Sequence, residues 1–306
     1  NRPDVISLSN LLLAGLARGL KKELGVPIVC SLQGEDFFLD GLPAAFRDQC
    51  WETLAQRAED VDLFIAPSFY FADLMSRRLR IPSTKMKVIY NGIDLDGYDA
   101  KNDVKDQTPT VGYFARMCRE KGLDLLVDAY IELRKRGRTG NVRLKIGGSC
   151  GPADEPFVAG QREKLKAAGC LDEVEFHPNL SREEKIRFLK SLTVFSVPAL
   201  YGEAFGLYVI EALAAGVPVV QPRHAAFPEI LRATGGGTLA ETNASALTDA
   251  LEYYLLNPSK AVETGEIGQR SVQEKFTADR MASEISQVFR QALNGAETSV
   301  GASGAS

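Results

Sequence analysis

The sequence predicts an α/β protein built from two blocks of parallel β-strands with covering helices. Short apolar, β-rich runs alternate with helical patterns along most of the 306 residues, and this alternation indicates parallel strands joined by right-handed crossovers. A polar stretch with few large apolar side chains interrupts the alternation between residues 94 and 109. We therefore expect a bilobed protein with a domain boundary near residue 100 and a ligand-binding cleft between its lobes.

The first block begins with a helical pattern of leucines between Leu11 and Leu24, which also carries Arg18, Lys21 and Lys22. One interpretation is a helix that lies on a membrane surface. The preferred interpretation is a helix that flanks a sheet, because a Gly-Val-Pro turn and an apolar strand follow it at once. Further along this block we expect strands at 28–32, 62–66 and 87–90, and helices at 44–59 and from 68 to 79.

The second block repeats the alternation and ends in three consecutive helices. A Ser-Arg-Glu-Glu sequence from residue 181 has the form of a capping box, which predicts the start of a helix. The last segment, 294–306, is small and polar, and we expect it to be mobile. Strands are predicted at 110–114, 142–146, 174–176, 193–197, 218–221 and 237–240, and helices at 123–136, 155–168, 206–216, 226–232, 244–256, 260–276 and 278–293. The predicted domains are 1–99, 100–277, and a segment 278–306 whose helix crosses back to the first lobe.

Bulk composition excludes several classes of protein. Hydrophobic residues make up 45% and charged residues 25% of the chain, and a net charge of −4 gives no basic excess for nucleic-acid binding. We find no apolar run of membrane-spanning length and no secretory signal. Five widely spaced cysteines indicate reduced thiols in a cytoplasm, and two histidines argue against a multi-histidine metal site. Because Asn1 opens the chain without a methionine, we expect a fragment or a processed chain.

The stretch 199–216 is the centre of the prediction. It lies between two apolar strands and reads as a turn followed by a helix that begins near Phe205 or Gly206 and stops at Gly216. Glu203 lies in the turn and Glu211 lies inside the helix. Open parallel sheets bind ligands at such places, outside the carboxyl ends of their strands, and the free N–H groups of a helix start bind anions.

Two cations follow the first strand of the second block. Arg116 and Lys121 lie between that strand and a helix that begins at Gly122. Two cations beside a helix start suit a diphosphate, because charge-assisted contacts are worth about 1.5–3 kcal/mol each. An Arg/Lys pair taken alone is more often a solvated basic loop, so this pair becomes specific only together with the two glutamates.

Together these elements resemble the retaining GT-B glycosyltransferases, which include glycogen synthases, sucrose synthases and bacterial mannosyltransferases. The resemblance consists of two glutamates that enclose Phe-Gly with seven residues between them, and an Arg…Lys-Gly element after the first strand of the lobe. It implies two Rossmann-like lobes with parallel sheets, of which the first is incomplete here. The implied activity is transfer of a hexosyl group from a UDP- or GDP-sugar, with retention, to a carbohydrate, lipid or small-molecule acceptor. It implies no metal, and no cofactor apart from the nucleotide-sugar co-substrate.

The resemblance also assigns roles to residues. Arg116 and Lys121 would neutralise the donor diphosphate and stabilise the leaving group. Glu211 matches the glutamate that binds the donor ribose, and Glu203 matches the one near the transferred sugar. Further matches are backbone groups of Phe205, Gly206 and Leu207 for phosphate and sugar, the loop from His177 to Leu180 for the base, and residues 91–94 for the hinge between lobes. Apart from the resemblance, Gly147 and Gly148 end a strand, and glycines there would allow a ligand to approach closely.

The first lobe departs from the family pattern. It lacks the usual opening Gly-rich loop, and Gln33, Gly34 and Glu35 occupy a place where many relatives have histidine. We interpret Gln33 and Glu35 as facing the acceptor side of the cleft. Much of the acceptor site would belong to the missing segment, so a separate N-terminal half, a homo-oligomer and peripheral contact with the inner membrane face remain open.

Two other functions compete with glycosyl transfer. One is a serine hydrolase, because the Gly-x-Ser-x-Gly pattern around Ser149 resembles a nucleophile elbow and His177 or His224 could complete a triad. Pro152 and Pro156, however, crowd the helix start that an elbow needs. The other is a nucleotide-sugar-binding fragment that does not catalyse. Two Asp-x-Asp pairs, at 60–62 and 94–96, match the Asp-x-Asp pattern of metal-dependent glycosyltransferases. We interpret both as turn residues.

Overall fold

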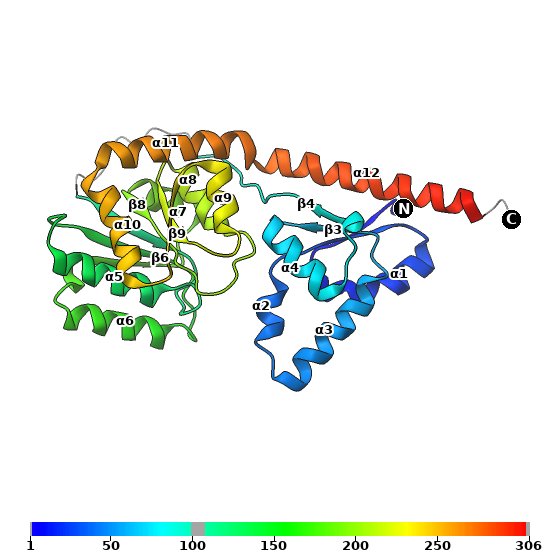
Figure 1. Cartoon of the computed structure of the whole chain (residues 1–306), viewed down its shortest axis with the longest axis horizontal. Coiled ribbons are helices and arrows are strands. Elements are labelled where there is room, and N and C mark those ends of the chain that lie inside the picture. Colours follow the sequence, from blue (N-terminus) through cyan, green and yellow to red (C-terminus); the bar gives the residue numbers. More distant parts are fainter. Residues whose placement is uncertain (1, 99–107, 304–306) are drawn as a thin grey trace. The chain divides into compact units, whose positions relative to one another are not determined.

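The computed structural model describes residues 2–98 and 108–303, with side chains described up to residue 295. The chain divides into two compact units, shown in Figure 1. Unit 1 comprises Asn1–Gly92 and Ala278–Ser306, and unit 2 comprises Ile93–Thr277. The chain thus changes unit between Gly92 and Ile93, whereas the boundary predicted near residue 100 falls on residues outside those described.

Unit 1 is built around a parallel sheet of four strands in the order β1-β2-β3-β4. A short 3₁₀ helix η1 follows β1, because the Asn10 side chain accepts a hydrogen bond from the Leu12 N–H and starts a helical turn. The helix α2, which begins at Glu35, was not predicted. The elements are β1 (Ile6–Leu8), η1 (Leu11–Leu16), α1 (Ala17–Leu24), β2 (Ile28–Ser31), α2 (Glu35–Asp40), α3 (Ala44–Ala58), β3 (Leu63–Ala66), α4 (Phe69–Leu79), η2 (Ser83–Lys85), β4 (Met86–Val88) and α12 (Ala278–Ser303).

The C-terminal helix α12 completes the core of unit 1. Val288 and Ala292 of α12 are buried against a cluster of apolar side chains from the sheet, and Arg280 donates a hydrogen bond to the Tyr90 carbonyl. The sequence predicted that the helix ends at 293 and that the tail is mobile. The predicted end at 293 was wrong, because α12 runs to Ser303 and Gly295 does not end it. The mobility of the tail stays a prediction. The cluster comprises Val29, Leu63, Ile65, Ile89, Val288 and Ala292.

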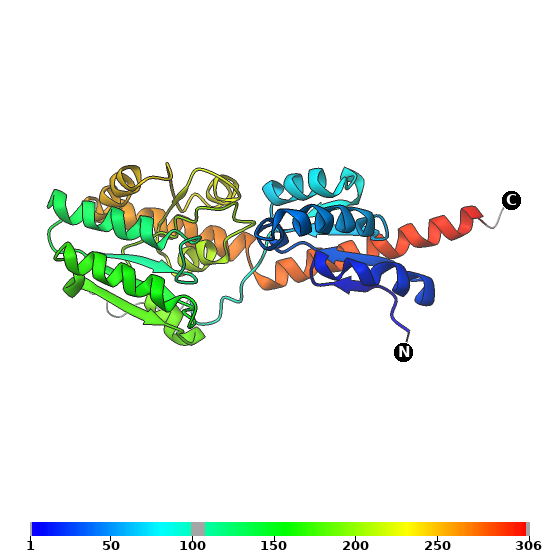
Figure 2. The same ribbon diagram turned by 90° about the horizontal axis from the view of Figure 1, so that it is seen from below.

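Unit 2 contains a parallel sheet of six strands in the order β10-β9-β8-β5-β6-β7. The chain enters at β5, adds β6 and β7 on one side, and then returns to add β8, β9 and β10 on the other side. Figures 1 and 2 show helices on both faces, with α5 and α6 on one face and α8 and α11 on the other. The elements are β5 (Thr110–Phe114), α5 (Leu123–Arg136), β6 (Arg143–Gly148), α6 (Glu155–Ala167), η3 (Leu171–Glu173), β7 (Val174–Pro178), α7 (Arg182–Lys190), β8 (Val194–Phe195), α8 (Leu207–Ala214), β9 (Val219–Pro222), α9 (Phe227–Thr234), β10 (Gly237–Ala240), α10 (Ala244–Leu256) and α11 (Pro258–Lys275).

The order of unit 2 reverses between β5 and β8, so the crossovers on either side of this pair cover opposite faces of the sheet. The loops that leave the carboxyl ends of β5 and β8 therefore diverge, and ligands of open α/β sheets bind at such a switch point. Both strands are anchored in the core, where Val111, Tyr113, Val194 and Phe195 are fully buried. Within the part of the chain that the structure describes, no helix has the length and apolar character needed to cross a membrane.

Candidate functional site

The predicted donor-site residues of unit 2 gather around the switch point between β5 and β8. The loop 115–122 connects β5 to α5, and the loop 196–206 connects β8 to α8. The first loop carries Arg116 and Lys121, and the second carries Glu203. Glu211 lies inside α8, the helix that follows the second loop. The two cations and the two acids therefore come from two neighbouring strand–loop–helix units of one sheet, β5 to α5 and β8 to α8. We call these two units the βα corners.

These two corners are held together by their backbones. The Leu200 N–H donates to the Glu120 carbonyl at 2.9 Å. Gly122, the residue before α5, has a φ of 72°, and a Cβ at this position would lie 1.9 Å from the Pro198 carbonyl oxygen. Only glycine fits such a close approach, so this residue fixes how near the two loops lie.

Lys121 and Glu203 meet across this junction. The Lys121 Nζ lies 2.6 Å from Glu203 Oε2, and their side chains are only 20% and 13% exposed. The hydroxyls of Tyr201 and Tyr208 donate to the same oxygen at 3.0 and 2.9 Å. The ammonium group also lies 4.9 and 5.2 Å from the centres of these two tyrosine rings. Lys121 is thus held in an aromatic cage with a carboxylate at its base.

Arg116 is oriented by an acid that the sequence did not reveal. Its Nε donates to Asp154 Oδ1 at 3.0 Å, and a terminal nitrogen lies 2.8 Å from the same oxygen. The Asp154 side chain is 9% exposed, whereas that of Arg116 is 57% exposed. The hydrogen bond from Arg116, followed by one from the Gly151 N–H, holds the pKa of Asp154 below its usual value. The guanidinium is therefore fixed from one side and open to solvent on the other.

Glu211 also has a cationic partner that was not predicted. Lys185 of α7 reaches it, and its Nζ lies 2.6 Å from Glu211 Oε1 with both side chains mostly buried. Within the described residues, the second carboxylate oxygen of Glu211 has no hydrogen-bond partner, and the same is true of Glu203 Oε1. Each glutamate thus has one carboxylate oxygen that is hydrogen-bonded within the described residues and one that is not.

The start of α8 supplies backbone donors beside these acids. The helix begins at Leu207 after Gly206, whose φ of 87° is the left-handed conformation that glycine favours. The first-turn N–H groups of Leu207 and Tyr208 have no acceptor within the helix. Phe205, by contrast, is buried and packs on Phe276 with ring centres 6.2 Å apart, so its side chain serves the core.

The end of β6 lies against the Arg116 loop. Gly148 has a φ of 127°, and a Cβ there would lie 1.8 Å from the Ala115 carbonyl oxygen, which explains a glycine at this position. Asn179, in the loop after β7, exchanges two hydrogen bonds with the backbone of Cys150, each 3.1 Å long. The sequence placed this asparagine in the loop from His177 to Leu180 but gave its side chain no role, because its partners lie far from it in the sequence.

The residues predicted to contact the base lie at the end of β7. The His177 ring is 3.0 Å from Glu175 and packs edge-on against Phe188, and Leu180 is half-buried just before the Ser181 cap of α7. Their loop joins β7 to the helix that carries Lys185. A role in base recognition stays a prediction for both residues.

In unit 1, the three residues predicted for the acceptor side have different surroundings. Glu35 is buried, and its two oxygens accept hydrogen bonds from the Leu11 and Gln33 N–H groups at 2.7 and 2.8 Å. The expectation that Glu35 faces an open cleft was therefore wrong, because its carboxylate ties η1 to the end of β2. Gln33 is exposed, and Gly34 precedes α2 with a φ of 92°.

The geometry also excludes a hydrolase triad at Ser149. The helix α6 begins only at Glu155, so Ser149 does not lie on a strand-to-helix elbow. His177 pairs with Glu175, and His224 hydrogen-bonds to the Ala199 carbonyl, which leaves both rings engaged elsewhere. Within the described residues neither histidine contacts Ser149.

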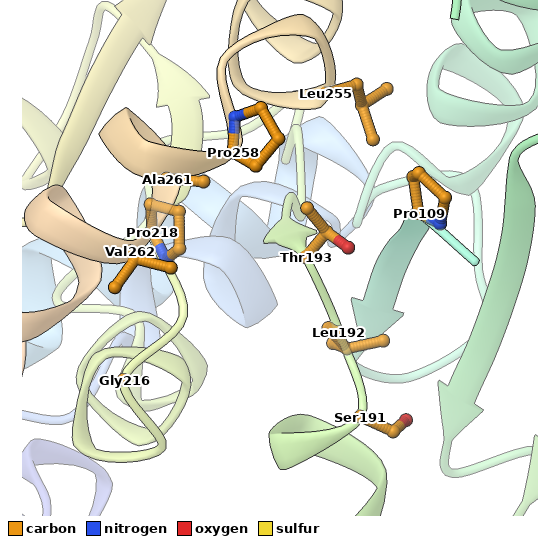
Figure 3. Close-up of a pocket in the computed structure, with 10 residues that line it drawn as sticks. All are labelled: Pro109, Ser191, Leu192, Thr193, Gly216, Pro218, Leu255, Pro258, Ala261 and Val262. Carbon is orange, nitrogen blue, oxygen red and sulfur yellow. The ribbon is translucent and has the colours of Figure 1, made fainter. Parts of the chain in front are cut away.

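A separate pocket of about 180 Å³ opens at the opposite edge of the unit 2 sheet (Figure 3). Pro109, Leu192, Thr193 and Pro218, which precede the amino ends of β5, β8 and β9, line it together with Pro258 of α11. No charged side chain contributes to its lining. Charged and hydrogen-bonding groups are instead concentrated at the carboxyl edge, where we assign the site.

The curated relatives include bacterial mannosyltransferases. The lipopolysaccharide core biosynthesis mannosyltransferase LpcC of Rhizobium leguminosarum bv. viciae is 30% identical over 226 residues, which cover 70% of this chain and 61% of that protein. A GDP-mannose-dependent α-(1-6)-phosphatidylinositol monomannoside mannosyltransferase of Mycolicibacterium smegmatis is 26% identical over 258 residues, 79% of this chain and 64% of that protein. The chain thus spans about three fifths of the length of these relatives.

Solved structures share the fold. A sucrose-phosphate synthase from Thermosynechococcus elongatus matches with a TM-score of 0.79 and 22% identity, over 95% of this chain and 74% of that one. The Anabaena protein HepE, solved in complex with UDP, matches with a TM-score of 0.81 and 18% identity, over 94% and 79%. These likenesses confirm the predicted class, an α/β protein with the two parallel-sheet lobes of GT-B glycosyltransferases.

Two family descriptions match adjoining parts of the chain. Residues 1–96 match glycosyltransferase family 4. Residues 96–271 match the glycosyl transferases group 1, and this match alone covers more than half of the 306 residues. It includes both βα corners described above and all four of their charged residues. The chain therefore belongs to the glycosyl transferases group 1 family.

Proposed function

We propose that the protein transfers a hexosyl group from a nucleoside-diphosphate sugar to an acceptor, with retention of the anomeric configuration and without a metal ion. Arg116 and Lys121 take the donor diphosphate, Glu211 takes the ribose hydroxyls, and Glu203 lies at the transferred sugar. Retention, and the division of roles between the acids, rest on the resemblance of this residue pattern to retaining enzymes.

One observation carries the proposal. Lys121 and Glu203 come from different βα corners, yet their charged groups are 2.6 Å apart and the corners are joined by the Leu200–Glu120 backbone bond. A ligand at this junction meets a cation, a carboxylate with one open oxygen, and the amides at the start of α8. A diphosphate attached to a sugar has the complementary groups: phosphate oxygens for the cation and the amides, and sugar hydroxyls for the carboxylate.

The chemistry that such a site supports is mainly electrostatic. When the sugar–phosphate bond breaks, negative charge grows on the diphosphate, and the cations and amides that already hold the bound donor stabilise that charge. Arg116 is already held by Asp154, so little reorganisation is needed on its side. Glu211 fixes the far end of the nucleotide, which converts binding energy into correct placement of the sugar. These two cations would supply the charge that a divalent ion supplies in other transferases.

The relatives suggest which donor and acceptor to test first. The two curated relatives described above are named as mannosyltransferases, one of them GDP-mannose-dependent, and their names refer to lipopolysaccharide core and phosphatidylinositol mannoside. HepE has also been solved with UDP-glucose. We therefore propose GDP-mannose as the first donor, UDP-glucose as the second, and a glycan carried on a lipid as the acceptor class.

The test is release of nucleoside diphosphate from each donor, with and without glycolipid acceptors, followed by NMR of the product's anomeric proton. We expect turnover that is at least about a hundredfold slower in Glu203→Gln, because a contact at the reacting sugar is worth about 2.7 kcal/mol or more in the transition state. Ser149→Ala should retain full activity. Tight donor binding without any turnover would instead indicate a chain that binds nucleotide sugars and does not transfer them.

A further inference from the structure

Glu203 carries an unusual concentration of donors on one oxygen. Its Oε2 accepts from the Lys121 ammonium group and from the hydroxyls of Tyr201 and Tyr208, while the Tyr201 hydroxyl itself accepts a hydrogen bond from Lys121. Two tyrosines therefore bind the same carboxylate oxygen as the lysine. Nothing in the resemblance to other glycosyltransferases assigned a role to either tyrosine.

This arrangement conflicts with the role proposed for Lys121. An ammonium group that binds the donor diphosphate must turn part of its donor capacity away from Glu203, whose side chain is only 13% exposed. A buried carboxylate that loses its cation is costly unless other donors remain on it. Either the binding free energy of the ligand offsets this cost, or other hydrogen-bond donors of the protein take the place of the lysine on Glu203.

We propose that Lys121 is handed from Glu203 to the diphosphate when the donor binds, and that Tyr208, assisted by Tyr201, keeps Glu203 in place during the exchange. The proposal rests on the function proposed above. Tyr208 is then a positioning residue, which acts on the diphosphate only through Lys121 and Glu203.

Tyr208 is better built for this task than Tyr201. It belongs to α8, is buried, and its ring packs against those of Phe195 and Phe227, with each pair of ring centres 6.4 Å apart. Burial, followed by the neighbouring Glu203 charge, raises the pKa of Tyr208 well above its usual value, so the hydroxyl keeps its proton and donates. Tyr201 lies in the loop before α8 and is half-buried.

A double-mutant cycle on nucleotide binding tests the proposal. GDP and UDP are titrated calorimetrically into the wild-type chain, Tyr208→Phe, Lys121→Met and the double variant. We expect Tyr208→Phe to weaken binding about fivefold when Lys121 is present, since the departing lysine then leaves Glu203 with one donor fewer. In the Lys121→Met background the same change should have an effect below about twofold.

Tyr130→Phe is the matched control. Tyr130 of α5 is also a buried tyrosine, and its hydroxyl donates to the Val142 carbonyl at 2.7 Å, away from the charged residues of the site. Its loss should lower stability and leave nucleotide affinity unchanged, as thermal unfolding without ligand will verify for each variant. Equal effects of Tyr208→Phe in both backgrounds, or none in either, would overturn the exchange. If Lys121→Met itself leaves affinity unchanged, or if neither nucleotide binds, the proposed function fails and the exchange fails with it.

Discussion

At the scale of single residues, each charged group of the site is held by a partner of opposite charge. Lys121 pairs with Glu203, Lys185 with Glu211, and Arg116 with Asp154. The sequence identified Arg116, Lys121, Glu203 and Glu211 through their spacing relative to strands and helices. It could not identify Asp154 or Lys185, because a lone acid near a helix start and a lone lysine inside a helix resemble ordinary surface residues.

Lys185→Met should separate binding of the ribose from binding of the phosphates. Without the lysine, Glu211 loses the group that fixes its Oε1, so we expect GDP affinity to fall about fivefold to tenfold, or about 1–1.4 kcal/mol. Inorganic pyrophosphate has no ribose, and its affinity should not change. Lys164→Met, which removes an exposed lysine paired with Asp128 on the α6 side, is the control. An equal loss of pyrophosphate affinity would contradict the proposal that Glu211 binds the ribose.

The Arg116–Asp154 pair predicts a pH dependence of stability. The pKa of Asp154 is lowered in the folded state, first by the hydrogen bond from Arg116. Its contribution is therefore fully present above the unfolded value of about 3.9 and is lost as pH falls through the lower folded value. Urea unfolding should show Asp154→Asn to be less stable than wild type at pH 6, with a gap that narrows as pH falls below about 4. A gap independent of pH would contradict the assignment.

At the scale of elements, alternating apolar runs predicted every described strand except β1, and most of the helices, because burial on both faces of a parallel sheet leaves a strong pattern. The short helix α2 and the length of α12 were missed. The helix α2 begins directly after Gly34, and its first two residues, Glu35 and Asp36, are acidic although they are buried. Acidic residues do not give the apolar periodicity that predicts a buried helix face. In α12 the small and polar residues from 294 onward suggested an end, although no proline follows to enforce one.

The junction between the two βα corners predicts which glycine can be replaced. Gly122→Ala places a Cβ 1.9 Å from the Pro198 carbonyl oxygen at a φ of 72°, and we expect a loss of about 3 kcal/mol in unfolding free energy. Gly137→Ala, at the end of the same helix, has a similar φ of 67° with no atom within 4 Å. It should cost only the backbone term of about 1 kcal/mol. Similar losses for the two variants in chemical unfolding would refute the steric account of this junction.

At the scale of the whole molecule, two units are formed from a chain that leaves unit 1 after Gly92 and returns to it at Ala278. The sequence anticipated two lobes and a last helix that returns to the first, but not where the chain changes unit. Polarity between 94 and 109 suggested a later boundary. Residues 93–98 are nevertheless tied into unit 2, since the Ile93 N–H donates to the Phe276 carbonyl and Tyr98 is buried.

The most direct test of the central claim is calorimetric titration of GDP into wild type, Arg116→Ala and Lys121→Ala. A control, Val288→Ala, loosens the core of unit 1 by about 2 kcal/mol and leaves unit 2 untouched. The account predicts that each cation variant binds GDP at least tenfold more weakly, about 1.4 kcal/mol, while Val288→Ala binds like wild type. Unchanged GDP affinity in both cation variants would contradict a diphosphate site at the junction of β5 and β8.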